Sequence, residues 1–552
     1  MKFFWFFLIV LKVLWASNTN SELQNQNRIL DLLEKQKEQN YIQEQLQYPD
    51  KYKSDDQGEI KEFEDNKEYI FSHISIQSQI KIPKTLIKML ANYQNKPLKK
   101  QDIFEIIKKT SEYYIKKGYT TTLVTIKSGN VKTGKLVLEV KLGYINHIEI
   151  KNSKYSNIRV FDAFPIGKND ILDIYALDQG IENLNNGGYY YQMRVEPSQK
   201  LDYSNILIEE FKTPGGISIG FNNSSTIDKG SFRSVLGLNQ YNLLGINDTL
   251  SLNYMERFIH RRNKNKESIY SANYTLPFRY WKFLYSASYT DSYTDIQAQF
   301  GSYSNKSENL RNTFKIQRVL HRNKTAKTTV YAELKLRGQK NKINEVLIEI
   351  NSKKYTALGI GIEHVNKLFG GNLYLDIEYL RGVPFFGGYK DTKNSIFKAQ
   401  YNKLNLSASW QKYLYYGNYV ALMYRLNVGA SYSGDELYYA DKFFIGDQYT
   451  VRGFKESSLA LDKGGYISQT ITLKPVYLQG SIWNLEPFFG LDYGGGRDYG
   501  LSHNDHIAGV AFGVNYFWKI ISLGVTISQP LMRSKDMPAE FVPIYFNLNI
   551  FM

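Results

Sequence analysis

The chain has 552 residues and no Cys, and its formal net charge at pH 7 is +16. This length exceeds what one hydrophobic core serves, which predicts several domains or one very large barrel, and the lack of Cys excludes disulfides and thiolate chemistry. No apolar run after residue 16 approaches the ~20 residues of a membrane-spanning helix, so helical membrane spans are excluded.

The positive charge does not by itself predict nucleic-acid binding. The sequence has neither a helix-turn-helix pattern nor a zinc-finger spacing. The basic runs are scattered, and two of them, His260 to Lys266 and Arg337 to Lys342, are interpreted as hairpin connections. Solvated loop cations are the favoured interpretation, and anionic lipid headgroups or a large secreted substrate would suit the charge equally well.

Residues 1–17 resemble a secretory signal peptide. Lys2 precedes an apolar stretch over residues 3–15, and the small residues Ala16 and Ser17 follow it. Because this stretch is too short to span a membrane as a helix, it predicts export of the chain.

Residues 18–47 predict a mostly polar helix. The stretch from Ser21 to Gln47 lacks Gly and Pro and is rich in Gln, Glu and Lys. Its apolar stripe is too narrow for an apolar core, which leaves a solvated arm or an element housed in a polar cavity. Residues 48–69 are charged and aperiodic, and they predict a linker.

Residues 70–142 and 143–212 predict two small α+β modules in tandem. In the first module a helical pattern ends at Gly118, a C-terminal cap that Tyr119 follows, and two alternating strands come next. The second module repeats the order strand, helix, helix, strand, strand. The alternative, two unrelated α+β domains, would make this repeated order a coincidence.

Residues 213–552 predict a membrane β-barrel. The helical period gives way to alternation, as where Leu404 and Leu406 face one way and Lys403 and Asn405 face the other. About sixteen such segments are present, and an even number of long alternating strands is typical of closed outer-membrane barrels. The predicted fold class is therefore mainly β, with a 16-stranded antiparallel transmembrane barrel.

The longest connection in this region spans residues 433–464. Short turns lie on the periplasmic side of such barrels and long loops lie outside. Counting strands from Gly216 places this connection outside, between the eleventh and twelfth strands. It contains Val451, Arg452, Gly453 and Phe454. An Arg followed by Gly is common, so the pattern alone also describes an exposed tight turn with a solvated cation.

A later strand offers a partner for Arg452. Between Leu485 and Tyr493 the apolar residues alternate outward, which turns the intervening positions into the lumen. These inward positions are Glu486, Phe488, Gly490, Asp492 and Gly494. Asp492 is a carboxylate among small residues, so the sequence predicts space for a bidentate ion pair with Arg452.

Taken together, these motifs resemble the two-partner secretion transporters, the haemolysin and filamentous-haemagglutinin secretion proteins. The resemblance rests on "KKGYTTTLVTIKSGNVKTGKLVLEV", "DKGSFRSVLGLNQYNLLGINDTLSLNY", "VRGF" and "FFGLDYGGG" in this order. It implies that residues 18–47 are a plug helix and that residues 70–142 and 143–212 are polypeptide-transport-associated (POTRA) domains. It further implies that the loop 433–464 folds inward, placing Arg452 against Asp492.

The resemblance also implies the function and the partners. Periplasmic POTRA domains would capture an unfolded exoprotein, a large β-helical partner, by β-augmentation, and the barrel would conduct it to the cell surface. Outer-membrane lipid would surround the barrel, and the barrel-assembly machinery would insert it, with Phe551 next to the end of the chain. No catalytic residue, cofactor, metal or nucleic acid is expected. No ATP motif is present, so folding of the cargo outside would drive export.

Three other classes explain less of the sequence. An outer-membrane assembly factor of the same superfamily is the main alternative, but such factors usually carry more POTRA units and no plug. A passive porin or adhesin leaves the two modules without a purpose. An enzyme is least favoured, since the one close His pair, His503 and His506, is better explained as solvated loop residues than as a metal site.

Overall fold

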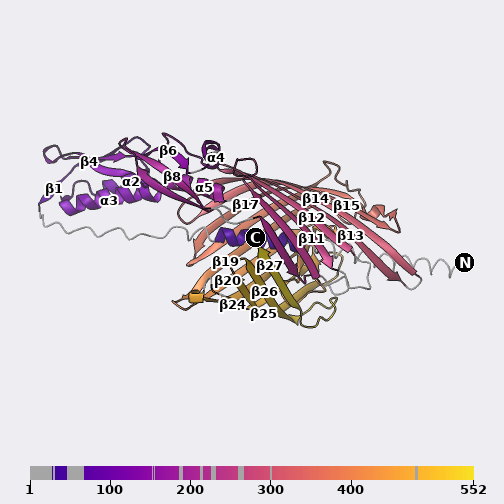
Figure 1. The fold of residues 1–552 in the computed structure, drawn as a ribbon. Coiled ribbons are helices and arrows are strands. Elements are labelled where there is room, and N and C mark those ends of the chain that lie inside the picture. The colour runs from indigo at the N-terminus through magenta and orange to yellow at the C-terminus, as the bar shows by residue number, and fades with distance from the viewer. Residues whose placement is uncertain are drawn as a thin grey trace.

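The structure is a computed structural model, which describes residues 28, 31–46, 67–151, 153, 156–185, 190–211, 216–224, 232–258, 266–298, 301–478, 481 and 483–552. The predicted signal peptide, most of the predicted linker and most of the basic run His260 to Lys266 lie outside these residues. Figure 1 shows two small α+β modules in a row that leads to one rim of a large barrel. In the described part of the chain, no helix is long and apolar enough to cross a membrane.

The first module is a three-stranded sheet covered by two helices. Its sheet has the order β2-β5-β4, with β2 parallel to β5, and a two-stranded sheet of β1 and β3 accompanies it. The sequence pattern did not indicate β1 or β3. The elements are β1 (Glu68–Ile70), β2 (His73–Ser78), α2 (Lys84–Ala91), β3 (Pro97–Lys99), α3 (Lys100–Lys116), β4 (Leu123–Asn130) and β5 (Lys135–Lys141).

The core of this module follows from two periodicities. Ile106, Thr110 and Tyr114 recur every four residues of α3 and are buried on one face of the helix. Leu136 and Leu138 alternate along β5 and are buried against the helices. One side of the sheet therefore carries both helices, as the predicted α+β class requires.

The second module repeats this design. Its sheet has the order β6-β8-β7, again with the first strand parallel to the last one in the chain. The elements are β6 (Tyr144–Ile150), α4 (Ser156–Ala163), α5 (Ile174–Asn185), β7 (Tyr190–Pro197) and β8 (Tyr203–Phe211). Two successive modules with one sheet order confirm the predicted tandem of α+β units.

Gly118 joins the two modules. It follows α3 with a φ of +101°, a left-handed conformation that other residues rarely adopt. Its carbonyl oxygen accepts a hydrogen bond from the backbone N–H of Ile174, at the start of α5, over 2.9 Å. Asp173 lies so close that a Cβ on Gly118 would come within 2.3 Å of the Asp173 Oδ1. Burial raises the pKa of Asp173, against the hydrogen bonds it accepts from two backbone N–H groups.

We expect Gly118→Ala to destabilise this junction by about 1–3 kcal/mol, because it adds backbone strain and a clash with Asp173. Hydrogen exchange of the Ile174 amide in the full chain measures the free energy of local opening. Gly129→Ala is the matched control, since its Cβ would meet only ordinary contacts, the nearest at 3.6 Å from Leu136. Equal protection of the Ile174 amide in both variants would contradict the prediction.

The barrel closes with sixteen wall strands, as predicted. The strand β16 (Val346–Leu347) is a short addition that pairs with the end of β15. The wall consists of β9 (Ile217–Asn222), β10 (Phe232–Tyr241), β11 (Thr249–Phe258), β12 (Lys266–Phe278), β13 (Trp281–Ala298), β14 (Gly301–Arg322), β15 (Lys327–Ile343), β17 (Lys354–Leu368), β18 (Gly371–Val383), β19 (Asn402–Tyr416), β20 (Val420–Ser433), β23 (Lys463–Pro475), β24 (Leu485–Arg497), β25 (Asn504–Trp518), β26 (Ile521–Met532) and β27 (Ile544–Phe551).

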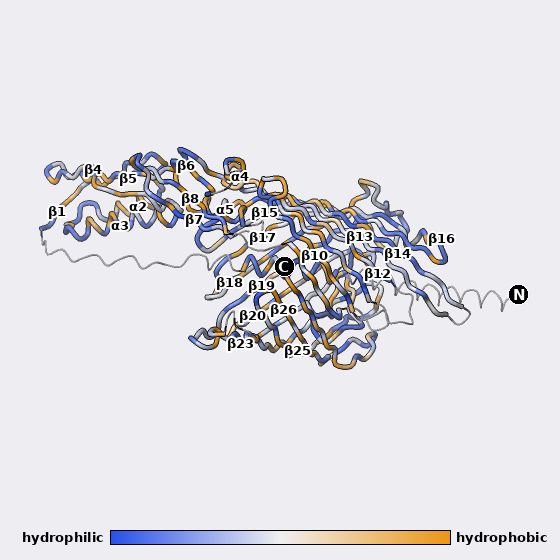
Figure 2. The backbone as a smooth tube through the Cα atoms, viewed as in Figure 1, coloured by the Kyte–Doolittle hydropathy of each residue, from blue (hydrophilic) through white to orange (hydrophobic). Residues whose placement is uncertain are grey.

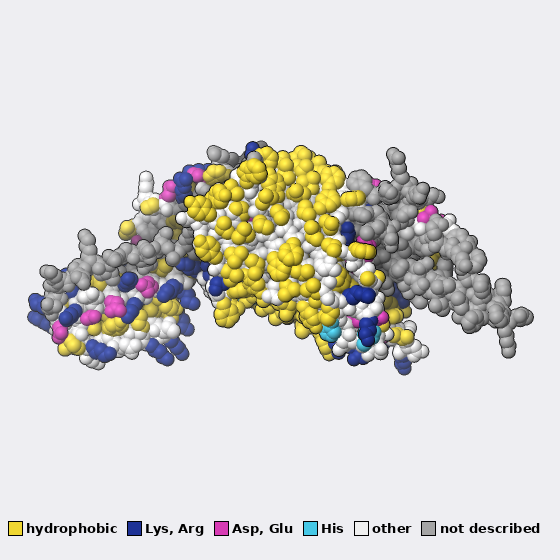
Figure 3. Space-filling model, turned by 90° about the horizontal axis from the view of Figure 1, so that it is seen from below, with side chains coloured by type: hydrophobic (Ala, Val, Ile, Leu, Met, Phe, Trp, Pro, Cys, Tyr) yellow, Lys and Arg dark blue, Asp and Glu magenta, His cyan; other side chains and the backbone are white. Residues whose placement is uncertain are grey.

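The wall has an apolar outside and a polar inside. Hydrophobic and hydrophilic positions alternate along the strands in Figure 2, because successive side chains of a strand point to opposite faces. In the space-filling view, hydrophobic side chains cover the barrel in a broad belt, while Lys and Arg gather on the modules and on the rim (Figure 3). Such a belt is the surface that a barrel presents to lipid.

One sequence-based expectation about the outer hairpins is wrong. The basic run from Arg337 to Lys342 is no hairpin connection but lies inside β15. Polar residues beyond the lipid belt can remain hydrogen-bonded within the sheet, so polarity does not mark where a strand ends.

The second module is fixed to the periplasmic rim of the barrel. At the turn after β12, the Arg279 backbone N–H donates to the Asp162 carbonyl oxygen over 2.7 Å. Arg322, the last residue of β14, donates to Glu182 over 2.7 Å. Lys327, at the start of β15, donates to Glu182 over 2.9 Å. Backbone and charge-assisted bonds therefore tie α4 and α5 to the rim.

Candidate functional site in the barrel lumen

The loop between β20 and β23 carries a hairpin of its own. Its strands are β21 (Phe443–Ile445) and β22 (Leu459–Leu461), and the tip between them contains Arg452. Val451 and Phe454 are buried with Ile507 of the wall. The tip is thus packed against the inside of the barrel by its apolar residues and is not an exposed turn.

Arg452 meets Asp492 from the barrel wall. Its Nε donates to Asp492 Oδ2 over 2.6 Å and its Nη2 donates to Oδ1 over 2.6 Å. The Arg452 backbone N–H also donates to Oδ2 over 2.9 Å, and Nη2 reaches the Gln469 carbonyl oxygen over 2.9 Å. Arg452 is 8% and Asp492 2% exposed, so this is a bidentate, desolvated ion pair.

The other residues of the predicted barrel motif surround this pair. Phe488 borders the lumen cavity from β24, and Gly494 is buried opposite Tyr466 of β23. Gly490 lies directly under the guanidinium, where an added Cβ would come within 2.1 Å of Arg452 Nη2. Gly453 has a φ of +115° and follows Arg452 at the tip.

We expect Gly490→Ala to displace the Arg452 guanidinium from Asp492 and to lower the export that the sequence resemblance implies. The added methyl group has no room beside Nη2, and the flexible Arg side chain is the group that must move. Gly338→Ala in β15 is the matched control, because its Cβ would meet nothing nearer than 4.0 Å. The readout is the amount of the implied exoprotein outside the cell, normalised to the amount of folded barrel. Equal output from both variants would contradict the prediction.

Gly118 and Tyr119 lie far from this pair in the chain, in the first module. Tyr119 packs against the core of that module, with its ring 6.5 Å from the ring of Tyr114. Burial is the main cause that raises the pKa of Tyr119. These two residues therefore shape the module and its junction, and they do not contact the lumen.

The N-terminal helix, residues 31–46 of the described chain, lies inside the barrel (Figure 1). Tyr41 donates to Glu363 over 2.6 Å, and Asn372 donates to the Leu46 carbonyl oxygen over 2.7 Å. Arg311 pairs with Glu34 over 2.7 Å. The sequence left two environments open for this helix, a solvated arm and a polar cavity. In the structure the helix lies in the polar cavity.

The helix also touches the loop. Lys35 Nζ donates to Asp447 over 3.0 Å and to the Phe444 carbonyl oxygen over 2.7 Å. The other oxygen of Asp447 accepts the backbone N–H groups of Tyr449 and Thr450 over 2.7 and 2.9 Å, at the start of the tip. Sequence reasoning missed Lys35 and Asp447. Nothing in their local pattern separates them from solvated charges.

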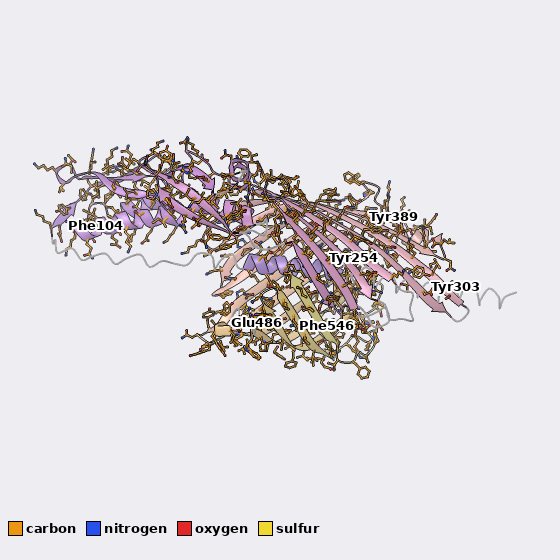
Figure 4. The ribbon with its side chains drawn as sticks, viewed as in Figure 1. Phe104, Tyr254, Tyr303, Tyr389, Glu486 and Phe546 are labelled. Atoms are coloured by element: carbon orange, nitrogen blue, oxygen red, sulfur yellow. The ribbon has the colours of Figure 1, made fainter. Side chains whose placement is uncertain are left out.

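A polar cavity of about 1210 Å³ remains around the helix and the loop. Glu486 on β24 and Phe546 on β27 both border it, and Figure 4 labels them on their strands. Lys335, Arg337, Lys403 and Arg425 line it too, so part of the positive charge that the sequence assigned to loops faces the lumen. The interior of this barrel is therefore polar and charged, in contrast to its apolar outer belt.

The structure places the two His residues, which the sequence analysis assigned to one loop, in different elements. His506 lies in β25, with its Nδ1 2.9 Å from the Tyr493 hydroxyl. His503 Nε2 lies 3.3 Å from Asp505 Oδ1 and 3.3 Å from Asp536 Oδ2. His503 thus lies between these two carboxylates.

A closed 16-stranded barrel that follows two α+β modules, with a helix and a long loop in its lumen, defines an outer-membrane transporter with periplasmic POTRA domains. The family model described as haemolysin secretion/activation protein ShlB/FhaC/HecB matches residues 202–516. A ShlB-type POTRA model matches residues 71–143 and a second POTRA model matches residues 144–197. The chain belongs to the haemolysin secretion/activation protein family, and its role is that of a transporter.

Curated relatives and a solved structure match most of the length of this chain. The outer membrane transporter CdiB of Dickeya dadantii is 26% identical over 494 residues, which cover 88% of this chain and 86% of the relative. The hemolysin transporter protein HpmB of Proteus mirabilis is 22% identical, covering 73% and 71%. The structure of CdiB from Escherichia coli has a TM-score of 0.88 at 20% identity, covering 95% of this chain and 98% of that one.

Proposed function

We propose that this transporter captures an unfolded exoprotein with its two POTRA domains and passes it through the barrel to the cell surface. The observation that carries the proposal is how the lumen is filled. The helix 31–46 is bound to the wall and to the loop by hydrogen bonds and ion pairs, such as Tyr41 to Glu363 and Lys35 to Asp447. Water can replace such contacts, so the helix can be displaced from the lumen at a low cost in free energy.

The domain assignment that goes with this function is as follows. Residues 1–17 are the signal peptide, 18–47 the plug helix and 48–69 the linker. Residues 70–142 and 143–212 are the POTRA domains, and 213–552 form the barrel with the inward loop 433–464. Arg452 and Asp492 are the clamp that holds this loop in its working position.

The edges of the two small sheets support capture by strand addition. Both β4 and β7 are edge strands, and each carries exposed apolar side chains, such as Leu123 on β4 and Val195 on β7. An edge strand offers unpaired N–H and C=O groups to an extended chain, and neighbouring apolar residues receive its side chains. An unfolded exoprotein supplies both.

The cargo that we propose is a large, β-helical exoprotein of the haemolysin class. The relative from Proteus mirabilis is named a hemolysin transporter, and the family model is described by haemolysin secretion. Outer-membrane lipid covers the apolar belt, and the barrel-assembly machinery inserts the chain. Folding of the cargo outside drives export.

The direct test is deletion of the gene in its native host, followed by a comparison of the proteins outside the cell. We expect one large protein to disappear from the outside, to reappear when the gene is restored, and to leave the levels of other outer-membrane barrels unchanged. A general loss of barrels, with that protein still outside, would instead support the assembly factor.

A further inference from the structure

The tip of the inward loop is held on its far side by the last outer loop of the barrel. This outer loop joins β26 to β27 and contains Glu540. Glu540 Oε2 accepts the backbone N–H groups of Lys455 and Glu456 over 2.6 and 2.9 Å. Its Oε1 accepts the backbone N–H and the hydroxyl of Ser457 over 2.8 and 2.6 Å.

This arrangement is a built carboxylate site. Three successive backbone N–H groups converge on one side chain, as they do where a chain binds an anion. Hydrogen bonds to an ionised carboxylate are shorter and stronger than those between neutral groups. Close by, the Tyr545 hydroxyl on β27 donates to the Phe454 carbonyl oxygen over 2.6 Å. Residues 454–457 are therefore bound immediately after the Arg452 that meets Asp492.

Glu540 is itself held in place. Met537, three residues earlier, is buried with Val451 and Phe454. Three residues after Glu540, the Pro543 carbonyl oxygen accepts the backbone N–H of Ser528 over 2.9 Å. The hydrogen bonds of Glu540 in the described chain all go to the loop tip, so its carboxylate serves the tip and not the barrel wall.

We propose that Glu540 is a positioning residue for the inward loop. Glu540 binds the C-terminal side of the loop tip, and Asp492 binds the Arg452 guanidinium. The chain around Arg452 is therefore fixed from two separate parts of the barrel. The effect of Glu540 on transport rests on the proposed function, whereas the binding of the loop tip by Glu540 does not. Binding and transport are therefore measured in separate arms of the experiment.

The first arm measures how often the loop tip leaves Glu540 in the full-length, folded chain, with the rate of trypsin cleavage as the readout. Cleavage after Lys455 requires that the tip leave Glu540, whereas Lys393, exposed in another outer loop, is an internal reference. In Glu540→Gln the carboxylate that accepts four hydrogen bonds is lost, so we expect cleavage after Lys455 to accelerate by about tenfold or more at unchanged cleavage after Lys393. Heat-modifiable migration of the barrel reports that each variant is folded.

The matched control is Glu345→Gln, which removes the same charge from an exposed site near the end of β15. We expect it to be cleaved like wild type. Tyr545→Phe is the second variant, since it removes only the hydroxyl bound to Phe454, and a smaller acceleration is expected. Unchanged cleavage after Lys455 in Glu540→Gln, or an equal acceleration in Glu345→Gln, would overturn the proposal.

The second arm measures export of the partner protein. We expect Glu540→Gln to lower export in the wild-type background and to add no further loss in an Arg452→Ala background, because it acts through the position of Arg452. A released tip with full export would overturn the positioning role. If Arg452→Ala itself exports normally, the proposed clamp of Arg452 and Asp492 fails, while the trypsin arm still decides whether Glu540 holds the tip.

Discussion

An Arg452→Ala chain is expected to insert in the outer membrane and to export its partner protein at a small fraction of the wild-type level. The substitution leaves Asp492 buried without the guanidinium that met both of its oxygens. Removing one member of a desolvated pair costs about 3–5 kcal/mol, which is enough to free the loop tip. The measurement is the amount of partner protein outside the cell, divided by the amount of heat-modifiable barrel in the membrane.

Two comparisons make this result specific to the pair. Lys393→Ala removes an exposed cation from another outer loop and is expected to export normally. Asp492→Asn should impair export as well, and the double variant should be little worse than either single one, since all three break the same bond. Normal export by Arg452→Ala, or simple additivity of the two losses, would count against the clamp.

Deletion of residues 18–47 is expected to raise the ion conductance of the barrel several-fold in a planar lipid bilayer. A helix with its side chains is ~10–12 Å across, and here it occupies the lumen of a 16-stranded barrel. Without it, the polar cavity around the loop becomes continuous with the space that the helix filled.

A matched control for this deletion keeps the helix but loosens it. Lys35→Ala removes the bonds to Asp447 and Phe444, so the conductance should switch more often between low and high levels without a permanent rise. A deletion variant that conducts like the intact chain would show that the helix does not limit the pore.

Much of this fold is readable from the sequence because strands have a period of two. Alternation alone assigns Asp492 to the lumen, and counting strands places the loop 433–464 on the outer side. That Arg452 reaches Asp492 does not follow from either rule. A loop tip has no period, and its direction is set by tertiary packing of Val451 and Phe454 against the wall.

The contacts of the loop tip and of the N-terminal helix show why other residues of the site cannot be predicted from the sequence. Glu540 binds three backbone N–H groups and one hydroxyl, and every residue except Pro has a backbone N–H, so the side-chain pattern does not mark its partner. Lys35 and Asp447 are 412 residues apart, and each stands in a locally polar segment. Only the closed barrel brings such residues together.

The attachment of the second module to the rim has a mechanical consequence. Glu182 is shared by Arg322 and Lys327, and Lys327 also donates to Gln45 at the end of the helix over 2.6 Å. The periplasmic arm is therefore a rigid bracket and not a swinging tether. Under the proposed capture by strand addition, a chain paired along β7 would therefore be held at a fixed distance from the barrel mouth.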